Sequence, residues 1–204
     1  LRFYMPEERA ELETELYNVE QAAAAAEQLK NAYNKLMTGL CQMKDIRTSL
    51  RRCAEGETPD HVELFEIKGY LQRLDSLRPL LAEIDAVTHF KGIALHDPKP
   101  ALAILDPDGT GSRGFYIPDS ATPKLKEVRQ AKKDVEERLF NAQTDAEKDD
   151  LRLKRTRLCA EEDAEEMRVR RAMGAALAPM VDDLLADAET SGRLDFIIQK
   201  ALFA

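Results

Sequence analysis

The sequence has no tryptophan, and only 6% of its 204 residues are aromatic. This scarcity disfavours an extensive β-sandwich, because aromatic residues are enriched in strands. Cysteine is also scarce, and Cys41, Cys53 and Cys159 form no Cys-x-x-Cys pair. An odd number of widely separated cysteines argues against a disulfide framework and favours a reducing compartment. We therefore expect a cytoplasmic protein.

Several functional patterns are missing as well. A zinc site needs converging ligands, but His61, His89 and His96 show neither His-x-x-x-His nor His-Glu-x-x-His spacing. No run of about 18 apolar residues occurs, so we expect no membrane span. The net charge of −8 does not favour a dedicated nucleic-acid binder. No nucleophile–base pair stands out, so we expect neither enzyme activity nor a cofactor in this chain.

The sequence is rich in helix formers. Charged residues make up 33% of the chain, and Ala, Leu, Glu, Gln and Lys dominate the segments before residue 54 and after residue 123. The pattern predicts a mainly α-helical bundle. The expected helix breaks are Gly39, residues 55–60, Arg78-Pro79, Gly174, Pro179 and Ser191-Gly192.

A heptad-like seam follows Pro123, which suits a first helical turn with Thr122 as N-cap. Its apolar residues fall on a 3,4 repeat in which Lys132 fills one slot: Leu125, Val128, Val135, Leu139 and Ala142. A turn at 141–145 then leads into a charged helix over 146–171. We predict an antiparallel two-helix arm, about 30 Å long on its outgoing side. One seam is too thin to bury a core, so the arm must project from a base.

The composition changes in residues 91–123, which lie between the two helix-rich segments and contain four glycines and five prolines. Two short apolar runs, 101–105 and 115–117, flank a glycine-rich loop. This arrangement predicts a small β-hairpin at about 101–117. The expected organisation is a helical core with the hairpin over 1–122, and lever helices that return to the core over 123–204, as one continuous module.

The loop between those runs resembles several binding motifs. Gly109, Gly111 and Gly114 spell G-x-G-x-x-G, but the expected strand, not a helix, follows them. A Walker loop needs a lysine where Phe115 stands. Oxygen ligands for calcium are present, but the twelfth position is Ile117 and not glutamate. We interpret the loop as a hairpin turn, with a weak ion site as the open alternative.

Three segments in order resemble the MutS family of DNA mismatch-repair ATPases. The most specific is Phe115-Tyr116-Ile117-Pro118-Asp119, followed by Pro123-x-Leu125 and Val128-Arg129. Residues 62–68 (VELFEIK) are similar to a core-domain helix of the family, and residues 194–201 (LDFIIQKA) to its closing lever segment. The resemblance spans about residues 60–204. It implies a core and lever domain that runs into an ATPase domain.

The resemblance also implies properties of a longer parent protein. The chain starts at Leu1 and ends at Ala204, and we expect it to be a piece of that parent. The parent would be a DNA-dependent ATPase, with ATP and Mg in its ATPase domain, and it would act as a homodimer on DNA. The family's mismatch-reading domain is not in this chain, and only residues 141–150 stand where many members insert a DNA-gripping clamp. Recognition of another DNA structure is therefore an open alternative.

Charge gives a separate indication of where DNA would bind. Residues 124–171 carry 14 basic and 13 acidic side chains, a balance of +1, while the rest of the chain is at −9. The candidate DNA-binding residues near the arm tip are Lys132, Lys133, Arg152, Lys154, Arg155 and Arg157. A solvated, salt-bridged helix face is the alternative interpretation. We thus expect a non-catalytic lever module, or alternatively a helical scaffold for protein partners without DNA binding.

Overall fold

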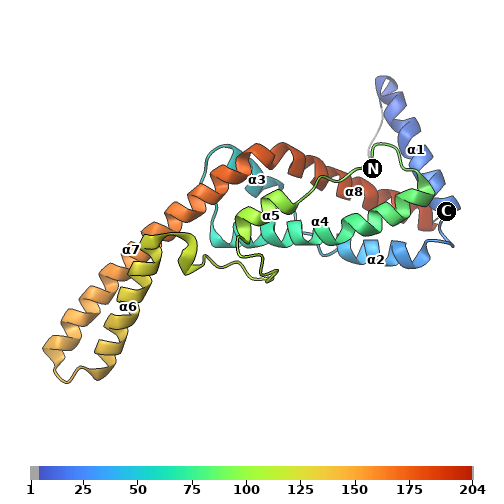
Figure 1. Cartoon of the computed structure of the whole chain (residues 1–204). Helices are drawn as coiled ribbons and strands as arrows, with labels where there is room; N and C mark the ends of the chain where they lie inside the picture. The colour runs from blue at the N-terminus through green and yellow to red at the C-terminus, as the bar shows by residue number, and fades with distance from the viewer. Residues whose placement is uncertain (1–4, 204) are drawn as a thin grey trace.

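The computed structural model describes residues 5–203, and helices form most of this part (Figure 1). In the base, the helices are η1 (Pro6–Glu8), α1 (Arg9–Ala24), α2 (Lys30–Leu40), α3 (Arg47–Ala54), α4 (His61–Thr88) and α5 (Lys99–Leu105). The rest are η2 (Asp119–Ala121), α6 (Pro123–Asn141), α7 (Asp145–Leu177), η3 (Ala178–Met180) and α8 (Val181–Phe203). An elongated base carries a two-helix arm at one end (Figure 1). The predicted helical class is confirmed.

The base has two hydrophobic cores, and α4 and α8 contribute to both. One core, next to the arm, joins α3, α5 and the end of α7 to the first halves of α4 and α8. The other joins α1 and α2 to the second halves of the same two helices. Tyr33 is fully buried in this second core and donates a hydrogen bond to the Ala22 carbonyl at 3.0 Å. Because α4 and α8 run through both cores, they connect the arm end of the base to its far end.

Side-chain caps define where the long helices begin. Asp60 accepts a hydrogen bond from the Glu63 amide at 2.8 Å, and the Glu63 carboxylate accepts one from the Asp60 amide at 2.8 Å. This reciprocal pair satisfies two amides that the first turn of α4 leaves free. Thr122 and Thr144 cap α6 and α7 through a single hydrogen bond each, which the Thr hydroxyl accepts from the amide of Leu125 or Glu147. These starts agree with the breaks seen in the sequence.

The predicted β-hairpin at about 101–117 is wrong. The described residues contain no strand, and residues 99–105 form the helix α5 instead. Ala101 and Leu105 are both buried, and their spacing of four residues is helical and not the alternation of a half-buried strand. Pro100 lies in the first turn of α5, where its missing N–H costs no hydrogen bond. Residues 106–118 then cross to the arm as an ordered loop.

Four predicted breaks lie inside helices, one of them Gly39, which is followed by only one more residue of α2. Pro79 sits within α4, Gly174 within α7 and Gly192 within α8, while Pro179 marks only the 3-10 turn η3 between α7 and α8. Pro79 removes one helical hydrogen bond. The apolar side chains on either side of it, Leu77 and Leu81, are buried in the same core, and this packing outweighs the loss.

Gly174 and Gly192 predict opposite responses to alanine. A Cβ on Gly174 would lie 2.8 Å from the Pro59 ring, whereas one on Gly192 would meet open space. We expect Gly174→Ala to lower the free energy of unfolding by about 1–2 kcal/mol, because overpacking exceeds the gain in helix propensity. Gly192→Ala should raise it by about 0.5–1 kcal/mol. Denaturant unfolding of the two variants checks this, and equal shifts would contradict the close packing of α7 on the 55–60 turn.

Two buried polar side chains fix the connection between α4 and α5. Asn18 on α1 is fully buried and pairs with Lys91, accepting from its amide at 2.8 Å and donating to its carbonyl at 2.9 Å. Asp187 on α8 is also fully buried and accepts from the amide of His96 at 2.9 Å, with the His96 ring Nδ1 at 2.9 Å. The hydrogen bond to Asp187 raises the pKa of His96 above its usual value. This irregular segment is therefore held to both α1 and α8.

Candidate functional site

The predicted arm is present, with α6 and α7 antiparallel and joined at residues 142–144 (Figure 1). Its seam buries Val128, Val135 and Ala142 from the α6 side against Leu151 and Leu158 of α7. At 33 residues, α7 is about 50 Å long, so it forms the arm and then continues into the base. Through η3, α7 leads directly into α8. A single nearly continuous helical path therefore connects the arm tip with the far end of the base.

Arg129 joins the arm to the segment that precedes it. Its Nε donates to Glu162 at 3.0 Å and its Nη2 to Glu166 at 2.7 Å, both on α7. Its Nη1 donates to the Ile117 carbonyl at 2.9 Å, and also to the side chains of Tyr116 and Asp119. Only 13% of the Arg129 side chain is exposed. One guanidinium thus connects α6, α7 and the 115–119 segment, which a lysine could not do because it lacks the planar fork.

Around Arg129, the effect of burial on the pKa values is opposed by the effect of nearby charged partners. Burial alone would lower the pKa of Arg129, but the hydrogen bonds that it donates to Asp119, Glu166 and Glu162 outweigh burial and raise the pKa. Burial alone would raise the pKa of Glu162, but Lys132 and Arg129 hold it below its usual range. Lys132 forms an ion pair with Glu162. Arg129, Lys132 and Glu162 are therefore charged at neutral pH.

Further contacts attach α7 to the base beyond Arg129. The buried Glu165 accepts from the Thr122 hydroxyl at 2.9 Å and from Arg168 at 2.8 Å. Arg170 donates to the Pro59 carbonyl at 3.3 Å, which links α7 to the turn before α4. A small apolar cluster of Ile117, Leu125 and Val169 lies beside these contacts. The arm base is thus a built junction and not a simple flexible linker.

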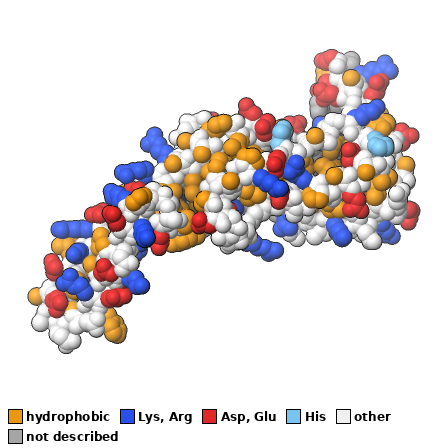
Figure 2. Space-filling view, viewed as in Figure 1, with side chains coloured by type: hydrophobic (Ala, Val, Ile, Leu, Met, Phe, Trp, Pro, Cys, Tyr) orange, Lys and Arg blue, Asp and Glu red, His pale blue; other side chains and the backbone are white. Residues whose placement is uncertain are grey.

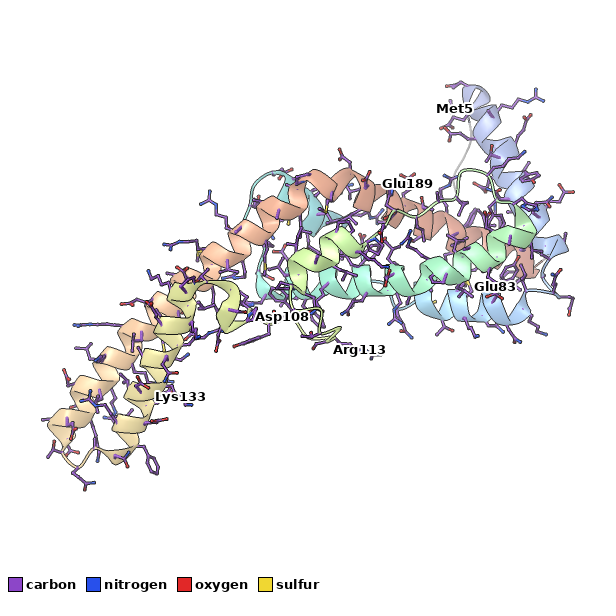
Figure 3. The ribbon with its side chains drawn as sticks, viewed as in Figure 1. Met5, Glu83, Asp108, Arg113, Lys133 and Glu189 are labelled. Carbon is purple, nitrogen blue, oxygen red and sulfur yellow. The ribbon has the colours of Figure 1, made fainter. Side chains whose placement is uncertain are left out.

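The six candidate DNA-binding residues divide into two groups. Lys132 pairs with Glu162, Arg155 with Glu136 and Arg152 with Asp149, so these three cations are already engaged. Lys133, Lys154 and Arg157 are exposed and form no ion pair with any residue from 5 to 203. Figure 3 shows Lys133 projecting from the side of α6. Half of the set matches the salt-bridged interpretation, and half remains available for a ligand.

The available cations do not form one compact patch. Arg155 faces α6, since it pairs with Glu136 there. Around the axis of α7, Lys154 lies about 100° from Arg155 and Arg157 lies about 160° from it in the same direction. Lys154 and Arg157 therefore share one side of α7, which faces away from the ion pair of Arg155. Lys133 lies on the outer surface of α6, about 140° from the seam position Val128. Acidic and basic side chains alternate along the visible face of the arm (Figure 2).

The glycine-rich loop is organised by Asp106 and Lys68. The Asp106 carboxylate accepts from the Gly111 amide at 2.8 Å and from the Thr110 hydroxyl at 2.9 Å. Lys68 on α4 is only 3% exposed, and its Nζ donates to the Gly114 carbonyl at 3.2 Å and lies 3.5 Å from Asp106. The carboxylate oxygens therefore fold the loop on itself and onto Lys68, and the calcium-ligand interpretation gains no support from this geometry.

Sequence reasoning did not single out Arg129 or Lys68 as structural centres. In the sequence Arg129 belongs only to the family-like segment, and its partners on α7 lie 33 and 37 residues away. Lys68 did carry a signal, because it follows Ile67 in the apolar register of α4, where a charged side chain needs a buried partner.

No helix between residues 5 and 203 is long and apolar enough to cross a membrane. Within the same described part, no three His, Cys, Asp or Glu side chains are placed to hold a metal ion. A comparison with protein-family models finds no match to this chain, and a comparison with curated proteins finds none.

Proposed function

We propose that this chain is the non-catalytic core and lever module of a MutS-like DNA-repair ATPase. The observation that carries the proposal is the helical path from the arm tip through α7, η3 and α8 to the far end of the base. A separate ATPase domain in the parent, with ATP and Mg, would act on this path, and the parent would work as a homodimer. The module would couple the nucleotide state of that domain to DNA at the arm.

The mechanical part of the proposal rests on stiffness. A packed two-helix arm turns as a unit, so a small rotation at its base becomes a larger displacement at its tip. The hydrogen bonds of Arg129 to Glu162 and Glu166 make α6 follow α7 in such a rotation. Burial of Glu165 against Thr122 adds a second point of attachment. Both attachments lie at the junction, where a lever needs its rigidity.

The DNA part of the proposal rests on the three available cations of the arm. DNA phosphates attract exposed Lys and Arg side chains, and each contact releases counterions. Lys154 and Arg157 are one helical turn apart on α7, a spacing that can follow a phosphate backbone. The engaged residues Lys132, Arg152 and Arg155 would then support the arm's own structure.

A salt-dependent binding titration tests the DNA part. We expect the Lys154→Gln/Arg157→Gln variant to bind DNA more weakly and to reduce the slope of log K against log salt by about 2. The matched control is Lys30→Gln/Lys35→Gln, which removes the same charge from exposed positions on α2 in the base. Fluorescence anisotropy with branched, mismatched and plain duplex DNA gives the measurement, on this chain and on the parent.

Two outcomes would contradict the DNA part. One is the absence of binding to all three DNA forms at low salt, for both this chain and the parent. The other is an equal loss in the arm variant and the α2 control, since that would show a general charge effect. In either case, a helical scaffold for protein partners would be the better description.

A further inference from the structure

A cleft of 980 Å³ lies on the base between α4, α5 and the glycine-rich loop. One exposed edge of α4, from Phe65 to Ser76, forms one wall, and Leu102 and Ala103 of α5 face it. The loop closes the cleft through Asp106, Gly111 and Arg113. Because Lys68 and Gln72 hydrogen-bond the loop carbonyls of Gly114 and Ser112, this wall is held in place without a ligand.

The floor of the cleft is apolar and open. Phe65 is 46% exposed, although it lies in the second turn of a helix that packs on the hydrophobic core. One turn further along α4, Gly69 leaves open space where a side chain would stand. Hydrophobic side chains gather on the base around α5 in the space-filling view (Figure 2). An apolar floor of this kind favours a ligand with its own apolar face.

The rim of the cleft is basic, in a chain of net charge −8. Lys44, Arg73, Lys99 and Arg113 surround it, and none forms an ion pair among the described residues. Of the acidic side chains there, Asp106 is compensated by Lys68, which leaves Glu66 and Asp75. The uncompensated balance is four basic against two acidic side chains. Figure 3 places Arg113 at the outer turn of the loop.

The amides of the three glycines in the loop already have hydrogen-bond acceptors. Gly109 donates to the Asp106 carbonyl at 2.9 Å, Gly111 to the Asp106 carboxylate at 2.8 Å and Gly114 to the Ser112 hydroxyl at 3.3 Å. A phosphate-binding loop needs such amides to point at the ligand. The loop therefore acts as a wall of the cleft and not as a phosphate cradle.

We propose that this cleft binds an acidic amphipathic helix from a protein partner. The helix would place its apolar residues on Phe65 and Leu102, and its carboxylates beside Arg73 and Arg113. Nucleic acid fits less well, because only one exposed aromatic ring lines the cleft for base stacking. The site lies on the base, so the inference goes beyond the proposed role of the arm in DNA binding.

The four basic side chains of the rim would contribute unequally to the association and dissociation rates of the helix. Arg73 is half-buried on α4 beside the apolar floor, so its pairing with a carboxylate is shielded from water and sets the dissociation rate. Lys44, Lys99 and Arg113 are exposed and would mainly speed association. Added salt should therefore weaken binding, chiefly by slowing association.

The test uses a fluorescent amphipathic peptide of about 15 residues, with Leu and Phe on one face and Glu on the other. A second peptide replaces each Glu with Lys, and an oligo-dT strand serves as the nucleic-acid probe. The blocking variant is Gly69→Glu, which adds an acidic side chain to the floor at a position where a Cβ would meet no atom within 4 Å. Gly192→Glu is the matched control, since it adds the same side chain at an equally open glycine of α8.

We expect the Glu peptide to bind wild-type protein and the Gly192→Glu control equally, and Gly69→Glu at least about tenfold more weakly. The Lys peptide should also bind at least about tenfold more weakly, and oligo-dT should not compete. Equal binding of the two peptides, or no effect of Gly69→Glu, would overturn the proposal. Displacement of the Glu peptide by oligo-dT would assign the cleft to nucleic acid instead. Thermal unfolding of both variants confirms that each is folded.

Discussion

Replacing Arg129 with methionine is expected to lower the free energy of unfolding by about 2–4 kcal/mol, because it removes the guanidinium that pairs with two largely buried carboxylates and leaves Glu162 only Lys132 and Glu166 only the His61 ring. Glu162 and Glu166 are 13% and 18% exposed, and both bind Arg129. They are four residues apart on α7, so without Arg129 they would also repel each other. The 115–119 segment would lose three hydrogen bonds in the same step.

The same change should widen the range of arm positions relative to the base. α6 would keep its apolar seam with α7, but it would no longer be tied to the segment that leads into it. Chemical denaturation measures the stability loss, and single-molecule energy transfer between dyes at the arm tip and on α2 measures the spread of distances. Arg129→Lys should recover only part of both properties, because an ammonium cannot reach both carboxylates and the loop together.

Arg155→Gln is the matched control for this experiment. It also breaks an arm ion pair, to Glu136 at 2.7 Å, but about half of each side chain is exposed. An exposed pair contributes less than about 1 kcal/mol, so stability and arm spread should change little. A loss as large as that of Arg129→Met would show that general arm charge, and not the junction, determines rigidity. An unchanged distance distribution in Arg129→Met would remove the junction from the lever mechanism.

The arm could be predicted from the sequence because its information is local. The repeat from Leu125 to Ala142 predicts which face of α6 is buried, and the turn residues at 141–145 predict where the chain reverses. The structure buries Val128 and Val135 in that seam and caps the helices at Thr122 and Thr144. Periodicity and capping depend on residues within one or two helical turns of each other, so both can be predicted without knowledge of the rest of the fold.

Local periodicity could not show that residues 101–105 form a helix, or that the helices continue through the predicted breaks. Residues 101–105 are apolar enough for either a strand or a buried helix, and a run of this length does not distinguish them. The helix is selected by packing of Ala101 and Leu105 against α4 and α7, which comes from distant parts of the chain. Packing in the second core similarly keeps α4 continuous at Pro79.

The candidate site shows the same limit for charges. Six cations near the arm tip were equivalent in the sequence, and the structure separates them by their partners. Lys132 finds Glu162 thirty residues away, whereas Lys154 and Arg157 find no partner in the described chain. Spacing within one helix cannot reveal such cross-helix pairs, so the division between structural and available cations needed the fold.

A second large effect is expected from Lys68→Met. The Lys68 side chain is 4% exposed and the Asp106 side chain 13%, so the variant leaves a largely buried carboxylate without its cation. We expect a loss of about 2–4 kcal/mol in the free energy of unfolding, together with looser attachment of the loop to α4. Asp106→Asn in the same chain should recover part of this loss, since it removes the uncompensated charge.

The loss should also depend on pH. Burial alone would raise the pKa of the Asp106 carboxyl, but the Gly111 amide, the Thr110 hydroxyl and the charge of Lys68 hold it below its usual 3.8. A lowered carboxyl pKa adds stability above the unfolded value, and this stability disappears as the pH falls through the folded value. The difference between wild type and Lys68→Met should thus be constant near neutral pH and shrink below about 4. Denaturant unfolding across that range measures it, and a difference that persists in acid would assign the role of Lys68 to packing and its bond to Gly114, not to its charge.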